Sequence, residues 1–301
     1  MKTLDGLRAD CLALLKSHQS EIDSPPYWYA LSDPALDKPT WRFWSELGGA
    51  SAPLLPKVPN GRVDVVPHLH ALRCGSDGLP VGLSSEQSQV RVEAMSLIAS
   101  RLPFGELLVH MQAFLEVRLV GGVDMLLAFW DNSVLGVLVG QEDDTTLHVR
   151  GPVLEDGQRA ALLAPIAAWW YADREQKWHR LAKPDAMAVP SKAEPLKLTQ
   201  VQEDKLVEAG VPDLILYHLK LNRPLLIDSA FSDAKWYRFV RAVLPSARGL
   251  GLEGVRDLVN FTALCIIYKQ RMQHDPDILQ LLDQVQLKER TLDEVMLLMP
   301  N

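Results

Sequence analysis

The sequence predicts an α+β protein, with an N-terminal mixed α/β sheet domain followed by a C-terminal all-helical lobe. Short apolar runs with strand character alternate with helical patterns over residues 1–181. Residues 182–198, AKPDAMAVPSKAEPLKL, contain three prolines among small and charged residues, a composition typical of a linker. Residues 199–301 contain only helical patterns. Two domains joined by a Pro-rich linker follow from these observations.

The first predicted elements are a helix and a strand. Apolar side chains recur with helical spacing over residues 4–17, which predicts a short amphipathic helix. The aromatic run 27–31, YWYAL, predicts a strand that ends in the turn Ser32-Asp33-Pro34. Three shorter elements are expected next: a helix over 41–47, an extended segment over 63–72 and a strand over 81–83.

Two helices are expected in the middle of this domain. Ser84-Ser85-Glu86-Gln87 has the pattern of a capping box, with Ser84 as the cap and Gln87 at the third helical position. This pattern predicts a helix that continues to about Ser100. A second helix is expected over residues 104–114.

Residues 115–138, LEVRLVGGVDMLLAFWDNSVLGVL, predict a β-hairpin followed by a helix. Gly121 and Gly122 separate two apolar runs and supply the positive φ values that a two-residue turn needs. Asp131 and Ser133 are short polar residues of the kind that cap the first free amides of a helix. A further strand is expected over residues 147–153.

An aromatic-rich segment closes the N-terminal domain. It contains Trp169, Trp170, Tyr171 and Trp178. Such a cluster serves either as core and lobe-packing material or as a binding platform, and the core interpretation is favoured.

The C-terminal lobe shows a series of helix start and stop signals. Thr199-Gln200-Val201-Gln202 is a capping box whose helix is expected to stop at Gly210, and Pro212 suits the first turn of the next helix. Another helix is expected from Ser232 to Pro245. The remaining predicted helices are one over 253–272, one opened by Asp275-Pro276 and a short one capped by Thr291.

The net charge and composition of the chain argue against some classes of binding partner. The net charge of −7 argues against nucleic-acid binding, because phosphate recognition needs a basic face. The longest apolar run, residues 160–171, is too short to span a bilayer, which takes about 20 apolar residues. The three cysteines are scattered, which fits a reducing compartment. We expect a cytoplasmic protein without membrane insertion.

His68 and His70 are the nearest approach to a metal signature. Two residues apart on a strand, their side chains face the same way, as a ligand pair requires. No cysteine or acidic partner accompanies them at a recognisable spacing, so an ordinary strand face is favoured over a metal site.

Other motif-like residues have simpler explanations. Gly249-x-Gly251-x-x-Gly254 matches the dinucleotide fingerprint but has no strand before it. Ser84-Ser85 does not complete the G-x-S-x-G nucleophile elbow, because Leu83 and Glu86 stand where other residues are needed. The carboxylates Asp33, Asp124 and Asp131 are far apart, and no spacing rule pairs them for acid–base chemistry. We therefore expect no catalytic residues, no metal and no cofactor.

Five segments, in order and spacing, resemble the conserved domain of the type VI secretion effector chaperones, also called adaptors. That family has an early YALLD strand, a GI-x-L-x-S junction, an HLR helix, a G-x-x-V-L-L-R-F-Y-D-P-R-V-L block and an F-x-G-P-I strand. The corresponding segments here are residues 29–33, 81–85, 110–112, 122–135 and 150–153. The motif residues expected to have structural roles are Tyr29, Asp33, His110, Phe129, Trp130, Asp131, Gly151 and Pro152.

The chain departs from the family pattern at three positions. Gln112 and Ala128 stand where the family has arginines, and Asn132 stands where it has a proline. If the family arginines form a polar network with the aspartate, this chain lacks it, and Asp131 is expected to act as a helix cap.

The resemblance implies a non-catalytic function. Such chaperones bind a specific toxin effector in the bacterial cytoplasm and help to load it onto the spike proteins of the secretion machine. A carrier of this kind needs exposed apolar surface for its cargo. Two alternatives stay open: a metal-dependent enzyme that uses His68 and His70, and a scaffold for a partner unrelated to secretion.

The helical lobe contains aromatic residues suited to a cargo contact: Tyr217, Trp236 and Tyr237. Trp236 and Tyr237 are adjacent, so their side chains diverge by roughly 100° around a helix. We expect one of them to be exposed and to contact the cargo.

Overall fold

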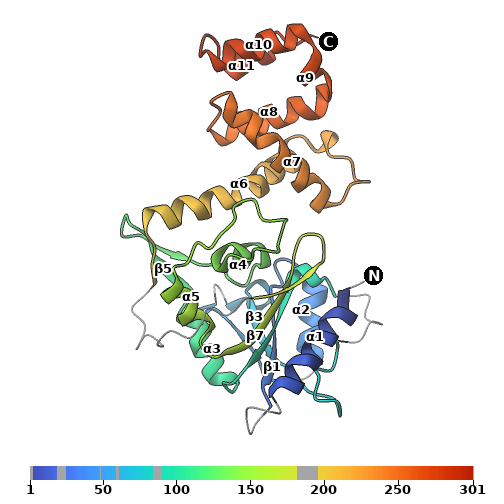
Figure 1. Cartoon of the computed structure of the whole chain (residues 1–301), viewed down its shortest axis with the longest axis vertical. Helices are drawn as coiled ribbons and strands as arrows, with labels where there is room; N and C mark the ends of the chain where they lie inside the picture. Colours follow the sequence, from blue (N-terminus) through green and yellow to red (C-terminus); the bar gives the residue numbers. More distant parts are fainter. Residues whose placement is uncertain are drawn as a thin grey trace. The chain divides into compact units, whose positions relative to one another are not determined.

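The computed structural model describes residues 3–18, 25–47, 49–58, 61–83, 90–181 and 196–300. The chain divides into two compact units, Met1–Leu206 and Val207–Asn301. The first contains an antiparallel sheet with helices and the second is helical, which confirms the predicted α+β class (Figure 1). Within the predicted linker, residues 182–195 lie outside the described residues.

The first unit is built on a six-stranded sheet in which every neighbouring pair is antiparallel. The central strands β1 (Tyr27–Ser32), β4 (Met95–Ser100) and β7 (Ile166–Ala172) are buried along nearly their whole length. The register pairs Tyr29 with Ile98 and Ile98 with Trp169. In sheet order the strands are β2 (Ser51–Pro53), β3 (His68–Ala71), β1, β4, β7 and β8 (Trp178–Arg180).

Successive side chains of these strands point to opposite faces of the sheet, and each face packs into its own core. Trp28 and Trp170 stack at 5.9 Å on one face, which is covered by α1 (Thr3–His18) and α2 (Lys38–Glu46). Trp169 and Tyr171 face the other way. That face is covered by α3 (Phe104–Gln112), α4 (Asn132–Val139) and α5 (Asp156–Leu163), which Figure 1 shows on the opposite side of the sheet from α1.

A second, three-stranded sheet contains the predicted hairpin. β5 (Glu116–Arg118) and β6 (Asp124–Leu126) pair antiparallel around Gly122, whose φ is +76°. β9 (Leu196–Lys197) pairs in parallel with β5, so the last residues of the Pro-rich segment join this sheet. The hairpin and the helix after it are thus confirmed. The predicted two-residue turn is wrong, because the amide of Leu119 donates to the carbonyl of Val123 and the loop therefore has three residues, 120–122. Of the two glycines, Gly122 has a positive φ and Gly121 does not.

Three further sequence expectations for the first unit are wrong. Residues 81–83 form a turn rather than a strand. The helix expected up to Ser100 is instead the short helix η3 (Val92–Ala94) followed by β4. The predicted capping box, residues 84–87, lies outside the described residues. β4 is buried on both faces, and its sequence, MSLIAS, lacks the alternation of apolar and polar residues that marks a half-exposed strand.

The third wrong expectation is the strand over residues 147–153, which is irregular. The amides of Val153 and Leu154 donate to the carbonyls of Val137 and Leu138 at the end of α4, at 3.1 and 3.0 Å. These backbone groups are therefore satisfied by a helix end instead of a strand ladder. The extended segment expected over 63–72 is the short helix η2 (Val63–Val65) followed by β3.

The second unit packs short helices around one apolar core. Its elements are the last part of α6 (Gln200–Asn222), η4 (Pro224–Leu226), α7 (Asp233–Gly249), α8 (Val255–Tyr268), α9 (Arg271–His274), α10 (Pro276–Gln286) and α11 (Leu292–Met296). The predicted caps Ser232, Asp275 and Thr291 are confirmed, because each side chain accepts a hydrogen bond from a backbone amide of the first helical turn.

The expected stops at Gly210 and Pro245 are wrong, because α6 runs through Gly210 and Pro212 and α7 runs through Pro245. In each helix a buried stripe continues past the proline, and packing outweighs the lost hydrogen bond. The stripes are Val211, Ile215 and Leu219 in α6, and Trp236, Val240, Leu244 and Ala247 in α7. Among the described residues, no helix has the length and apolarity needed to cross a membrane.

Candidate functional site

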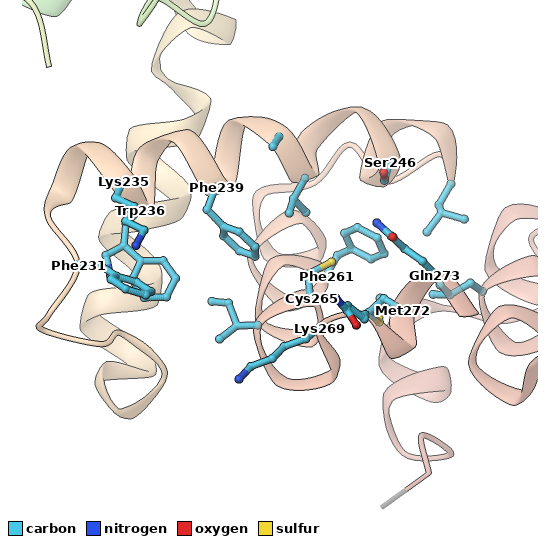
Figure 2. Close-up of a pocket in the computed structure, with 16 residues that line it drawn as sticks. Phe231, Lys235, Trp236, Phe239, Ser246, Phe261, Cys265, Lys269, Met272 and Gln273 are labelled. Atoms are coloured by element: carbon cyan, nitrogen blue, oxygen red, sulfur yellow. The ribbon is translucent and has the colours of Figure 1, made fainter. Parts of the chain in front are cut away.

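A groove with a mostly apolar lining lies in the second unit and has a volume of about 640 Å³. One wall is α7 and the facing wall is α8 together with the turn that follows it (Figure 2). Phe239 and Phe261 project into the space between these walls. Cavities of 300–1,000 Å³ with this lining are typical of binding sites.

An aromatic cluster forms one end of the groove. The ring of Trp236 lies 5.8 Å from that of Phe231 and 5.9 Å from that of Phe239, the latter edge-to-face. The indole Nε1 of Trp236 donates to the carbonyl of Asp228 at 3.1 Å. This bond fixes the indole, and Phe231 remains 41% exposed beside it. A rigid, accessible aromatic surface of this kind suits protein recognition.

The charges at the groove have one sign. Lys235 and Lys269 are the charged members of its described lining, and both are exposed. The Nζ of Lys235 lies 3.4 Å from the centroid of the Phe231 ring. Burial raises the pKa of the Cys265 thiol in the groove to about 12, so this cysteine is not a nucleophile at neutral pH.

The expectation that Trp236 or Tyr237 is exposed is wrong. Their exposed fractions are 6% and 4%. Tyr237 lies in the core of the unit, whereas Trp236 is covered by Phe231 and Phe239, so α7 is buried on two sides. Tyr217, on α6, is 60% exposed and does not line the groove. Of the three predicted contact residues, the groove contains Trp236.

His68 and His70 face the same way, and their rings stack at 5.9 Å. His70 is buried, with Nε2 3.0 Å from the hydroxyl of Ser32 and Nδ1 3.0 Å from that of Ser51. Burial, together with the neighbouring His68, lowers the pKa of His70 to about 3. Its ring nitrogens are occupied by serine hydroxyls, which leaves no pair of ligands for a metal.

A second polar cluster joins the ends of β7 and β8, where Asp144, Asp173 and His179 lie within ligand distance of one another. His179 bonds through Nδ1 to Asp143 at 2.9 Å and through Nε2 to Asp173 at 2.8 Å. Both nitrogens can donate only when the ring is protonated, and a protonated ring has no lone pair for a metal. Asp144 accepts from the hydroxyl of Tyr171 at 2.8 Å.

Burial lowers the pKa of His179, but the hydrogen bonds to Asp173 and Asp143 outweigh it, so the net pKa is above the ordinary value. The pKa values of both aspartates are lowered, because bonds to His179 and other donors outweigh burial. The cluster is therefore a charged hydrogen-bond network at the ends of two strands.

The motif residues of the first unit meet around α4. The side chain of Asp131 caps this helix by accepting from the amide of Ser133 at 2.8 Å, which confirms the predicted cap. Trp130 Nε1 donates to Asp33 at 3.1 Å. Phe129 is fully buried and packs edge-to-face on Trp169 at 6.2 Å. The hydroxyl of Tyr29 donates to the carbonyl of Leu102 at 2.7 Å.

Residues of two further motif segments, 110–112 and 150–153, contact the ends of helices. His110 Nε2 donates to the carbonyl of Leu162 at 3.0 Å and so ties α3 to α5. Gly151 packs so closely on the end of α4 that a Cβ there would collide with the carbonyl of Val137. Pro152 contacts Gly140, the left-handed residue that ends α4.

Residues 28–148 match a family model. Its description is "Domain of unknown function (DUF4123)". No curated protein and no solved structure matches the chain. Four of the five motif segments lie inside the DUF4123 region, and the fifth, residues 150–153, follows it directly.

Sequence reasoning missed several residues of these sites. The Nδ2 of Asn132, in the DUF4123 region, donates to the carbonyls of Glu93, Met95 and Ala172 at 2.9–3.1 Å. No local pattern predicts such long-range bonds. The sequence does contain a signal of the groove. Apolar and small residues recur in alternating steps of three and four positions, past Pro245, at Trp236, Phe239, Val243, Ser246 and Leu250.

Proposed function

We propose that this chain is a non-catalytic adaptor that binds a toxin effector of a type VI secretion system and helps to load it onto the spike proteins. The observation that carries the proposal is the DUF4123 match over residues 28–148, since this family is associated with type VI secretion effector adaptors. The motif segments also contact one another in space: Asp33 of the first bonds to Trp130 of the fourth.

The helical unit supplies a surface for such a role. A cargo-binding protein must present apolar area that a partner can cover. The groove between α7 and α8 offers this area, with the partly exposed Phe231 and Phe239 at one end. Its side chains bring no acid–base pair or nucleophile to the cavity, so a binding role accounts for its chemistry better than a catalytic one.

The test is affinity purification of the tagged full chain from its native host, followed by mass spectrometry. Recovery of a toxin-like protein or a spike component, absent from a parallel purification with the tag alone, is the expected result. A second measurement compares the secretion of that protein from cells with and without the chain. Recovery of neither kind of protein from cells that express the secretion machinery would refute the proposal, as would an unrelated stoichiometric partner.

A further inference from the structure

We infer that the groove between α7 and α8 binds one amphipathic helix of a partner protein, with acidic residues beside its apolar face. The inference rests on the proposed binding function and specifies the chemistry of the segment bound. Three observations support it: the length of the groove, the sign of its charges and the backbone at Lys269.

The groove is long enough to hold several turns of a helix. Its lining stripe on α7 runs from Trp236 to Leu250, 14 positions apart. That span is roughly 21 Å at 1.5 Å per residue. The opposite wall, which runs from Phe261 on α8 to Lys269 in the turn after it, lies across from this stripe (Figure 2). Recognition of a helix in an apolar groove uses anchors at positions i, i+3 or i+4, and i+7, which a groove of this length accommodates.

The charges favour an acidic segment. Lys235 and Lys269 both border the groove, and no aspartate or glutamate belongs to its described lining. Neither lysine forms an ion pair with a described residue, whereas the neighbouring Arg271 pairs with Asp275 at 3.0 Å. The net charge of the whole chain is −7, so the border of the groove is positively charged although the chain is acidic overall. Complementary charges at a rim select partners and orient them.

The backbone at Lys269 is the third observation. Lys269 has φ +49° and ψ −122°, and Gln270 has φ −64° and ψ −24°. These angles are those of a type II′ turn, whose first central position favours glycine. A lysine held in a conformation that suits glycine places its side chain at the groove despite the strain, a pattern characteristic of functional positions.

The experiment locates what covers the groove in the native host. A photo-crosslinking amino acid replaces Val243, a partly buried groove residue, in the tagged full chain. A matched chain carries the same group at Val123, an exposed apolar residue of the β5–β6 hairpin. The crosslinked peptide is identified by mass spectrometry. The expected product from position 243 is a segment with helical apolar spacing and flanking aspartates or glutamates, and position 123 should not yield that segment.

The second step measures affinity with a synthetic peptide of the crosslinked segment. Combined K235E and K269E substitutions should weaken binding by about tenfold or more. K288E is the matched control, because Lys288 is an exposed lysine of the same unit that does not line the groove. Exchanging the acidic residues of the peptide for lysine should restore binding to the K235E/K269E chain.

Each contrary result has a distinct meaning. If a secretion partner co-purifies but position 243 captures no segment, a basic segment, a second copy of this chain or a fatty acid, the groove inference is overturned and the proposed function stands. Equal affinity of the wild-type and K235E/K269E chains has the same meaning. If no secretion partner co-purifies, the proposed function fails, and the groove inference fails with it.

Discussion

The carboxylate of Asp33 accepts a hydrogen bond from the indole Nε1 of Trp130 at 3.1 Å, across 97 positions of sequence. Asp33 follows β1 and Trp130 precedes α4, so this bond attaches the first strand of the matched region to its last helix. Burial raises the pKa of Asp33, while bonds from Ala35 and Trp130 act in the opposite direction. The indole therefore stabilises the ionised form of a partly buried acid.

Trp130→Phe should lower the free energy of unfolding, because it leaves one oxygen of Asp33 without its donor. The expected loss is on the order of 1 to 3 kcal/mol at pH 7. The matched control is Trp41→Phe, since Trp41 is similarly part-exposed and its Nε1 pairs with no described residue. Urea titrations of both variants measure the difference.

The sign of the pH dependence provides a second check on this bond. Removing the donor raises the pKa of Asp33 further, so the loss in Trp130→Phe should grow as pH rises above about 4 and shrink as Asp33 becomes protonated. Equal losses in the two tryptophan variants, constant with pH, would show that the bond contributes nothing beyond ring packing.

His179 and His70 should give opposite pH dependences of stability. The raised pKa of His179 means that its contribution is fully present below about pH 6.5 and is lost as pH rises through the folded-state pKa. The pKa of His70 is lowered to about 3, so its contribution is present above about pH 6.5 and is lost as pH falls toward 3.

The measurement is the free energy of unfolding of wild type, His179→Gln and His70→Gln between pH 4.5 and 8.5. The wild-type advantage over His179→Gln should shrink above about pH 6.5, and the advantage over His70→Gln should shrink below it. Each slope is at most about 1.4 kcal/mol per pH unit for one proton. Parallel curves for all three chains would contradict both assignments.

Local sequence chemistry predicted the elements whose cause is local. The hairpin of β5 and β6 and the caps at Asp131, Asp275 and Thr291 follow from a few neighbouring residues, and the structure confirms them. β4 was mistaken for a helix because its burial on both faces removes the alternation that marks a strand.

Contacts between residues far apart in the sequence determine the features that local patterns did not predict. Trp236 and Tyr237 diverge around α7, yet both are buried, because Phe231 comes from outside the helix and covers the indole. The Asp33–Trp130 bond joins residues too far apart for any spacing rule. The lining stripe of the groove was readable in the sequence, but Lys235 and Lys269 border the same groove only because α7 and α8 pack together.

Asn132→Asp should destabilise the protein at neutral pH. The side-chain Nδ2 donates to the carbonyls of Met95 and Ala172 at 2.9 and 3.1 Å, inside the protein. A carboxylate oxygen in its place would face those carbonyls with no proton to donate, at an expected cost of about 2 to 4 kcal/mol. Ser133→Ala is the control, since it removes a less buried bond from the start of the same helix. Thermal unfolding should show the larger loss for Asn132→Asp, and equal losses would contradict the role assigned to the amide.

Lys269→Gly should stabilise the fold while weakening the binding of a partner at the groove. Glycine adopts φ +49° without the strain that a side chain imposes, and it costs about 0.5 to 1 kcal/mol in conformational entropy against about 1 to 3 kcal/mol of strain relieved. The matched variant is Lys288→Gly, because Lys288 also has a positive φ, +59°, after α10 and lies outside the groove. Both variants should raise the melting temperature, and only Lys269→Gly should reduce affinity for the segment captured at position 243. A Lys269→Gly protein that is more stable and binds equally well would mean that the lysine is tolerated at this turn without contributing to recognition.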